Sequence, residues 1–193
     1  SPLYLAADTR TWRVPGNGAM VVLPSMDKLK AIDVARLLLD KGANVNAQLS
    51  RQIPYRTKLD RGDDTMLGQG TTPFLRAAKA VDVQFMRVLL EAGADATLTK
   101  KDRTNAAMLV AAGQANAGYL GAGPDAALSA TLEALQMCVD KGVDLNAFNT
   151  AGQTAMHVAA GRGLDGVVKY LAGHGAKLDR TDKQGRTPLD VAL

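Results

Sequence analysis

The sequence predicts an all-α fold in which helix-turn-helix units repeat along the chain and stack into a solenoid. Three observations support this prediction. Two short sequence patterns alternate over the 193 residues, and a glycine recurs inside every copy of the second pattern. Aromatic residues make up only 4% of a chain that is 47% hydrophobic. A core of Ala, Leu, Val and Met suits closely packed helices better than a β-sandwich, which needs more β-branched and aromatic side chains.

The first pattern predicts the first helix of each unit. Where a threonine leads the pattern, its side chain can cap the helix N-terminus. A proline after it fits the first turn, because its missing N–H leaves no helical hydrogen bond unmade. An Ala-Ala pair inside the pattern gives a thin face on which the neighbouring helix can lie. The five copies begin at Ser1, Thr72, Ala106, Thr154 and Thr187.

The second pattern predicts the end of the second helix and the turn after it. Each copy has an apolar run, a glycine and a polar tail, at residues 37–47, 88–96, 137–147 and 170–179. The glycine falls just after the helix, where a left-handed C-cap favours a residue without Cβ. These glycines are Gly42, Gly93, Gly142 and Gly175.

Together the two patterns resemble the ankyrin repeat. The first is similar to the ankyrin signature Thr-Pro-Leu-His-x-Ala, and the 33 residues from Thr154 to Thr187 equal the ankyrin period. The second resembles the end of the ankyrin outer helix and the following loop. The resemblance, to a bacterial type of ankyrin-repeat protein with long insertions, implies a single domain over residues 1–193. Hairpin-like loops would join four full or expanded repeats and a partial fifth, at about residues 1–47, 71–99, 104–147, 152–182 and 185–193.

Three insertions depart from the family pattern, at residues 10–25, 48–70 and 114–128. The successive starts of the first pattern lie 71, 34, 48 and 33 residues apart, although the family period is constant. Comparison with the last full repeat places the first and third insertions between paired helices. The second lengthens the loop between the first two repeats. Insertions in solenoids often lie on a binding face, so we expect at least one of them to contact a partner.

Charge and composition leave several classes of partner open and make others less favoured. The chain has 23 Lys and Arg against 19 Asp and Glu, a formal charge of +4, and a pI near 9.3. This excess fits a partner with an acidic surface as well as it fits nucleic acid. Nucleic acid is less favoured because aromatic stacking platforms are few and acidic residues are interleaved. No apolar run reaches the ~18 residues of a membrane span.

Candidate catalytic side chains all have structural interpretations. His157 occupies the histidine position of the ankyrin signature, and His174 lies where outer helices of the family end. Cys138, the only cysteine, sits in an apolar helical run and is interpreted as a core residue. A single cysteine allows no internal disulfide, and the compartment stays open. The sequence also starts without a methionine, so it leaves the localisation open.

Metal and cofactor sites are not predicted. No Cys/His cluster exists for zinc. Asp60, Asp63 and Asp64 lack the ligand spacing of a calcium loop. Residues 68–72 contain two glycines and two threonines but no P-loop lysine. The sequence therefore favours a protein that is not an enzyme and carries no cofactor.

The residues that the repeat does not explain suggest a binding surface. The family architecture places loop tips and the exposed side of the first helices on one concave face. Cationic residues would make that face a basic groove, with Phe148 as an apolar contact, and Arg and aromatic residues are common interface anchors. The predicted groove contains Arg76, Lys79, Lys100, Lys101, Arg103, Arg180, Lys183 and Arg186. The insertion at 48–70 would add Tyr55, Arg56 and Lys58.

Two functions follow as hypotheses. The first is a non-catalytic protein–protein interaction scaffold that uses the concave basic face and the inserted loops. The alternative is a structural segment of a longer solenoid or of a self-stacking assembly. It is motivated by the ends of the sequence, which lack the polar outer face of a capping repeat, so self-association through open repeat ends is expected. The identity of the partner does not follow from the sequence.

Overall fold

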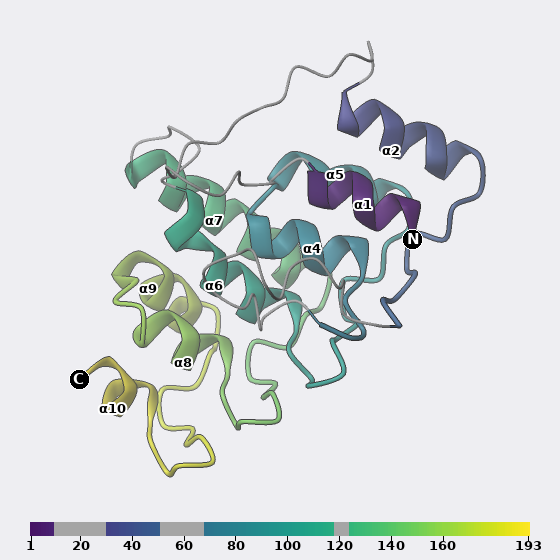
Figure 1. Ribbon diagram of the computed structural model, residues 1–193. Helices are drawn as coiled ribbons and strands as arrows, with labels where there is room; N and C mark the ends of the chain where they lie inside the picture. Colours follow the sequence, from purple (N-terminus) through teal and green to yellow (C-terminus); the bar gives the residue numbers. More distant parts are fainter. Residues whose placement is uncertain (10–29, 51–67, 118–123) are drawn as a thin grey trace, which may run out of the picture.

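The computed structural model describes residues 1–9, 30–50, 68–117 and 124–193 (Figure 1). All regular secondary structure within these ranges is helical. The all-α prediction is therefore confirmed. The predicted insertion at 10–25 and most of the one at 48–70, residues 51–67, lie outside the described residues.

The helices pack in antiparallel pairs that stack side by side. The first helices of the pairs form one row, in which α1, α4, α6, α8 and α10 follow one another, and α5, α7 and α9 form a second row behind it (Figure 1). This two-layered stack is the predicted solenoid of helix-turn-helix units. The helices are α1 (Pro2–Thr9), α2 (Ala31–Asp40), α4 (Pro73–Ala80), α5 (Val83–Glu91), α6 (Ala106–Ala117), α7 (Pro124–Asp140), α8 (Ala155–Ala160), α9 (Asp165–Gly173) and α10 (Pro188–Ala192).

Three of the first helices, α4, α8 and α10, begin at the side-chain caps that their threonines predict. The hydroxyl of Thr72 accepts a hydrogen bond from the Leu75 N–H at 3.1 Å, and Thr154 and Thr187 cap α8 and α10 in the same way. In α6 the cap is Asn105, whose Oδ1 accepts from the Met108 N–H at 3.0 Å. Asparagine caps as well as threonine does.

This cap corrects the sequence alignment by one residue. The alignment set Ala106 level with Thr154, but Asn105 holds the capping position. The capping residues 72, 105, 154 and 187 therefore lie 33, 49 and 33 residues apart. The second repeat consequently has the family period, and the excess between Thr72 and Thr154 falls entirely in the third repeat.

The second helices end as their glycines predict. Gly42, Gly93, Gly142 and Gly175 all have φ between 75° and 83°, in the left-handed region. Helix C-caps commonly take this conformation, in which a side chain would be strained. A polar turn follows each glycine and leads towards the next first helix.

Small residues let the first helices approach each other closely. The alanine pairs at 77–78 and 111–112 are buried, as predicted. A Cβ added to Gly113 at the end of this face would collide with the carbonyl oxygen of Lys79, so α6 leaves no room there. Phe74 and Phe85 fill the space between the rows and are fully buried, which stabilises the fold by roughly 2–3 kcal/mol each.

The third insertion lengthens two helices, which differs from the predicted loop at 114–128. α6 has 12 residues and α7 has 17, whereas the equivalent α8 and α9 have 6 and 9. Residues 114–117 and 124–128 are therefore helical, and Tyr119 and Leu120 lie outside the described residues. In the extension of α7, Leu128 packs so closely on Gly166 that a Cβ there would lie 2.8 Å from the leucine methyls. The alanine-rich composition explains the extra turns.

Candidate protein-binding surface

The candidate site is formed by the turns that lead from one repeat into the next. We call residues 100–104, 149–153 and 182–186 the loop tips. Each tip is closed by a backbone hydrogen bond of the same spacing, from the N–H of its first residue to the carbonyl of its fifth. These bonds are Lys100 to Thr104 at 3.0 Å, Asn149 to Gln153 at 3.0 Å and Asp182 to Arg186 at 2.9 Å. The three tips therefore correspond residue by residue.

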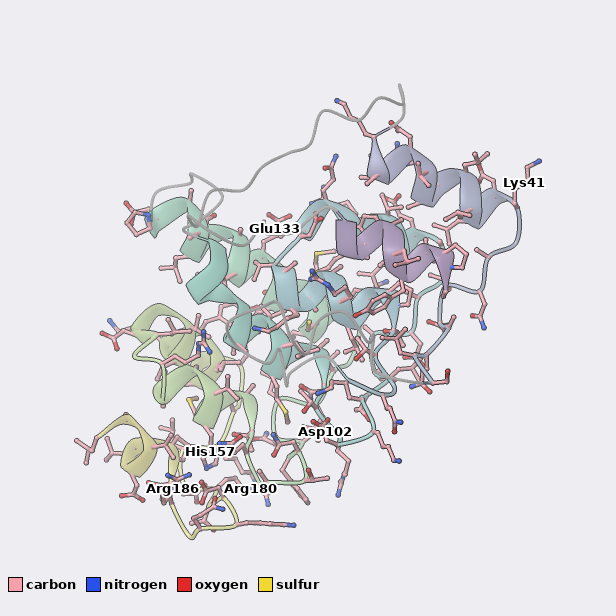
Figure 2. The ribbon with its side chains drawn as sticks, viewed as in Figure 1. Lys41, Asp102, Glu133, His157, Arg180 and Arg186 are labelled. Carbon is pink, nitrogen blue, oxygen red and sulfur yellow. The ribbon has the colours of Figure 1, made fainter. Side chains whose placement is uncertain are left out.

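Backbone hydrogen bonds also join the three tips into a row and connect the first tip to Gln69. The N–H of Lys101 donates to the Gln69 carbonyl at 3.0 Å, that of Thr150 to Asp102 at 2.8 Å, and that of Lys183 to Ala151 at 3.0 Å. Figure 1 shows these loops along one edge of the solenoid, and Figure 2 shows Asp102, Arg180 and Arg186 at that edge, far from Lys41. The tips form one continuous surface whose spacing is fixed by the backbone.

A polar side chain holds each tip from within. Asn149 Oδ1 accepts from the N–H groups of Ala151 and Gln153, and Asp182 Oδ1 accepts from those of Gln184 and Arg186. Such local bonds favour turns over regular structure. The polar side chain at the first position thus fixes the second and third tips.

The first tip uses a different arrangement. Lys100 stands where Asn149 and Asp182 stand, and Asp102 supplies the carboxylate instead. Asp102 Oδ1 accepts from the Thr104 N–H at 3.0 Å, and its Oδ2 lies 3.0 Å from Lys100 Nζ. Partial burial raises the pKa of Asp102, but the bonds from Thr104 and Lys100 outweigh it and lower the pKa below the ordinary value. The carboxylate is therefore charged at neutral pH and neutralises the buried lysine.

Burial corrects part of the predicted basic groove. Arg76, Lys79 and Lys100 were expected on its surface, but they are only 5%, 7% and 4% exposed. Lys79 Nζ donates to the Ala112 carbonyl at 3.3 Å, and Lys100 pairs with Asp102. Arg76 and Lys79 lie on α4, which packs between α1 and α6, whereas Lys100 lies in the first loop tip.

The remaining predicted cations stay at the surface. Lys101, Arg103, Arg180 and Lys183 are exposed, and Arg186 is exposed although it pairs with Asp182. The guanidinium of Arg186 lies 2.8 Å from Asp182 Oδ2. The three loop tips contain five cations and two carboxylates, a formal charge of +3 out of +4 for the whole chain. Most of the net charge is therefore concentrated along one edge.

Arg103 in the first tip contacts the side chain of Phe148, the residue that precedes the second tip. The guanidinium carbon of Arg103 lies 4.6 Å from the centroid of the Phe148 ring, a cation–π contact. Arg103 has φ 66°, at a position where the second and third tips have Gly152 and Gly185. Both residues were predicted as site residues, but their contact was not. The sequence contains one signal of this unusual position, because Arg103 aligns with Gly152 and Gly185 of the other tips.

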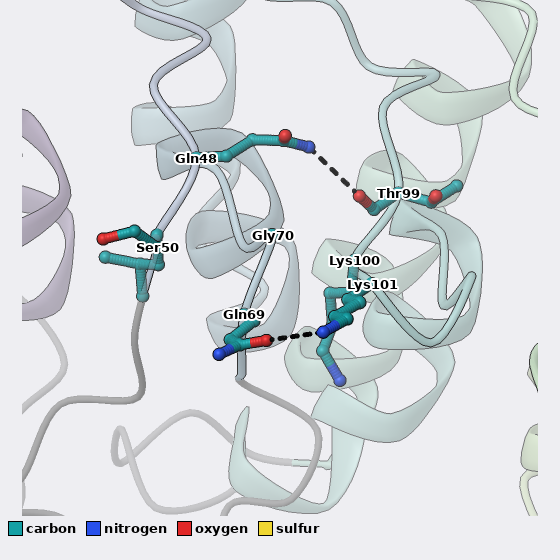
Figure 3. A pocket seen from close by; sticks show the side chains of 8 residues that line it. Gln48, Ser50, Gln69, Gly70, Thr99, Lys100 and Lys101 are labelled. Atoms are coloured by element: carbon teal, nitrogen blue, oxygen red, sulfur yellow. Dashed lines mark hydrogen bonds between the residues drawn. The ribbon is translucent and has the colours of Figure 1, made fainter.

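A groove opens beside the first tip. It has a volume of about 520 Å³ and runs between residues 48–50 and 99–101 (Figure 3). Gln48 Nε2 donates to the Thr99 carbonyl at 3.3 Å across it, and Lys101 Nζ donates to Gln69 Oε1 at 3.2 Å. The predicted site residues Tyr55, Arg56 and Lys58 lie outside the described residues.

The described residues give the candidate catalytic groups structural roles. His157 is buried and bridges two repeats, with Nδ1 3.0 Å from Thr154 Oγ1 and Nε2 3.2 Å from the Arg186 carbonyl. Burial raises the pKa of the Cys138 thiol to about 12, so the thiol stays protonated at neutral pH. Within the described ranges, no three acidic, histidine or cysteine residues are grouped as metal ligands. In the same ranges no helix has the length and apolar character of a membrane span.

Comparison with known proteins matches the last part of the chain to a family. Residues 139–192 match the family described as ankyrin repeats (many copies). The chain is 35% identical over 67 residues to human protein phosphatase 1 regulatory subunit 27, which covers 35% of this chain and 44% of the relative. It is 37% identical over 62 residues to serine/threonine-protein kinase 12 of Arabidopsis thaliana, covering 32% and 14%.

A third relative is a transient receptor potential cation channel subfamily A member 1 homolog from Caenorhabditis elegans. The identity is 34% over 64 residues, covering 33% of this chain and 5% of the relative. The chain therefore spans less than half the length of each of these relatives. Their names refer to a regulatory subunit, a kinase and a channel, so the shared region is not tied to one activity.

Proposed function

Because this chain is an ankyrin-repeat protein, we propose that it is a non-catalytic scaffold that binds another protein through its loop tips. Ankyrin repeats generally mediate protein–protein interaction. The observation that carries the proposal is the concentration of charge at the tips, +3 of the total +4. A partner with an acidic surface complements such an edge, and complementary charge accelerates association and selects partners.

The fixed geometry of the tips also supports this function. The backbone bonds of Lys101, Thr150 and Lys183 hold consecutive tips in a row, so little ordering remains to be done when a partner binds. Preorganised surfaces bind more tightly because they lose less conformational entropy. We therefore restrict the proposed binding face to the cations that are exposed and to Phe148. These cations are Lys101, Arg103, Arg180, Lys183 and Arg186.

The insertion at 48–70 is proposed to extend this surface. Its ends are paired, with the Leu49 N–H bonded to the Thr71 carbonyl at 3.0 Å and the Gly70 N–H bonded to the Leu49 carbonyl at 2.8 Å. Gln69 in turn contacts Lys101. The segment therefore begins and ends beside the first loop tip, where Tyr55, Arg56 and Lys58 would add to the contact area.

The relatives support a binding function more than a catalytic one. The first is a regulatory subunit of a phosphatase by name. The matches to the kinase and the channel cover only 14% and 5% of those proteins, so they provide no support for kinase or channel activity here. The structural roles of His157 and Cys138 agree with a scaffold that performs no chemistry.

A charge-reversal experiment tests the proposal. The variant Lys101→Glu, Arg103→Glu, Lys183→Glu changes the tips, and Arg36→Glu, Lys41→Glu, Lys169→Glu makes the same charge change on exposed residues at the second helices. Each is used as bait in native extract, and captured proteins are quantified and retested with purified components by calorimetry. We expect the tip variant to lose the partner and the control to keep it. Equal capture by both variants would rule out binding through the tips.

A second candidate function, stacking on further repeats, is favoured by exposed leucines at the two ends of the solenoid. Leu5 in α1 and Leu37 in α2 are 54% and 50% exposed, and Leu189 in α10 is 68% exposed. Further repeats of a longer solenoid, or a second copy, would bury them. Sedimentation velocity over a concentration series tests the second copy: association that is lost in Leu5→Ser, Leu189→Ser supports it, and a monomer at every concentration contradicts it.

A further inference from the structure

Arg103, which contacts Phe148, has a backbone conformation that no other non-glycine residue of the loop tips has. Arg103 is held in a left-handed conformation, φ 66°, which is sterically unfavourable for a residue with a Cβ. The corresponding tips avoid this cost with Gly152 and Gly185. Strained backbone that persists at a surface is often connected with function. The guanidinium of the arginine lies over the ring of Phe148, the residue before the neighbouring tip.

The charge of Arg103 is available to a partner. The carboxylate next to it in sequence, Asp102, accepts from Thr104 and pairs with Lys100. Among the described residues no carboxylate forms an ion pair with Arg103. Lys101 differs, because its ammonium already donates to Gln69, and Arg186 pairs with Asp182.

In this contact, the guanidinium of Arg103 and the ring of Phe148 can both still bind a partner. A guanidinium that lies over a ring keeps its N–H groups pointing outward in the plane, where they can bind a carboxylate with two parallel bonds. Phe148 remains 42% exposed, so part of its apolar surface is open beside the guanidinium. Contact with the ring also restricts the arginine side chain, which lowers the entropy that binding must remove.

We infer that Arg103 and Phe148 form a composite anchor for an acidic protein segment in which a carboxylate stands next to an apolar side chain. The carboxylate binds the guanidinium edge and the apolar side chain covers the exposed part of the ring. This inference rests on the proposed protein-binding function and specifies the partner's chemistry. Positive charge alone would select acidic segments without regard to their apolar residues.

Two fluorescent peptides of equal length and equal glutamate number test the anchor. One has leucine beside each glutamate and the other has serine, and both are titrated against the full chain at about 0.15 M salt by fluorescence anisotropy. We expect the chain to prefer the leucine peptide about tenfold, the effect of burying one leucine side chain. Phe148→Ala should abolish this preference, and circular dichroism would confirm that the exposed substitution leaves the fold intact.

Lysine–arginine exchanges provide the matched control. Arg103→Lys keeps the charge but loses the planar fork, so we expect it to weaken the leucine peptide about fivefold or more. Lys41→Arg, at an exposed residue beside the second helices and away from the loop tips, should leave the affinity unchanged. If Arg103→Lys binds like the unmodified chain, or if Phe148→Ala keeps the preference, the anchor is wrong while the basic surface stands. If neither peptide binds the unmodified chain, both the anchor and an acidic partner at the tips are wrong.

Discussion

Arg103 and Gly152 occupy the same position in consecutive loop tips, and both have a left-handed backbone, with φ of 66° and 81°. Glycine adopts this conformation without steric cost, whereas a Cβ approaches the following carbonyl. The first tip therefore stores strain that the second does not. Substitutions at Arg103 therefore measure the backbone strain, and substitutions at Gly152 measure the close packing between tips.

Replacement of Arg103 by glycine and by alanine should change the stability by different amounts. Both variants lose the contact with Phe148, but glycine also removes the backbone strain. We expect Arg103→Gly to be more stable than Arg103→Ala by about 1 kcal/mol. Urea unfolding followed by circular dichroism measures this difference. Equal stability of the two variants would show that the left-handed conformation is not maintained in solution.

Gly152 and Gly185 should differ in their tolerance of alanine, although both have positive φ. A Cβ on Gly152 would lie 2.7 Å from the Lys183 nitrogen, whereas a Cβ on Gly185 meets nothing within 4 Å. Gly185→Ala should cost only the backbone strain, about 1 kcal/mol. Gly152→Ala should cost a further 1–3 kcal/mol because the third tip must move away. Thermal unfolding of both variants checks the order, and a smaller loss for Gly152→Ala would contradict the contact between tips.

Asn146 should link the third and fourth repeats through its side chain. Its Nδ2 donates to the Gly175 carbonyl at 3.0 Å, and its Oδ1 accepts from the Lys177 N–H at 2.8 Å. Asn146→Ala removes both bonds and should lower the free energy of unfolding by roughly 1–2 kcal/mol. Asn146→Asp keeps the acceptor oxygen, so its free energy of unfolding should lie between those of the unmodified chain and the alanine variant. Hydrogen exchange at the Lys177 amide provides a local readout: its protection should fall in the alanine variant and persist in the aspartate variant.

Asp102 should make stability depend on pH in the acidic range. Its folded-state pKa is lowered from 3.8, so the carboxylate stabilises the fold fully above pH 3.8. That contribution disappears as the pH falls through the lowered value, because protonation is then favoured in both states. Asp102→Asn should therefore be less stable at neutral pH, where Lys100 loses its ion pair with the Asp102 carboxylate. Urea unfolding at several pH values should show the difference shrinking below pH 3.8, and a constant difference would contradict the prediction.

Residues with a local physical role made most of the fold predictable. Thr72, Thr154 and Thr187 mark helix starts because a hydroxyl can cap the free N–H groups nearby, and the structure confirms all three caps. Glycines at helix ends and alanine pairs between helices act over equally short distances. Asn105 caps equally well but breaks the repeated pattern, so its helix start was placed one residue late.

The sequence predicts less well which individual side chains are buried. Lys100 looks like any lysine at a loop tip until its turn is aligned with that of Asp182, which places both residues at the buried first position. The contact between Arg103 and Phe148 depends on the distance between two repeats and on one unusual backbone angle. Neither quantity is encoded in a local pattern. The helical extensions around 114–128 differ from the predicted loop for another reason, because this segment is rich in both glycine and alanine and its alanines favour helix.

The hydrogen bonds that run from Gln69 to Lys101, from Asp102 to Thr150 and from Ala151 to Lys183 have a consequence for how such a protein can change. The pair α6 and α7 is longer than its neighbours, yet the bonds on either side of it keep the same form. Added residues are accommodated at the far end of the helices and do not shift the tips. The edge at the far end of the helices can therefore gain residues during evolution, while the loop-tip edge keeps the spacing that its partner recognises.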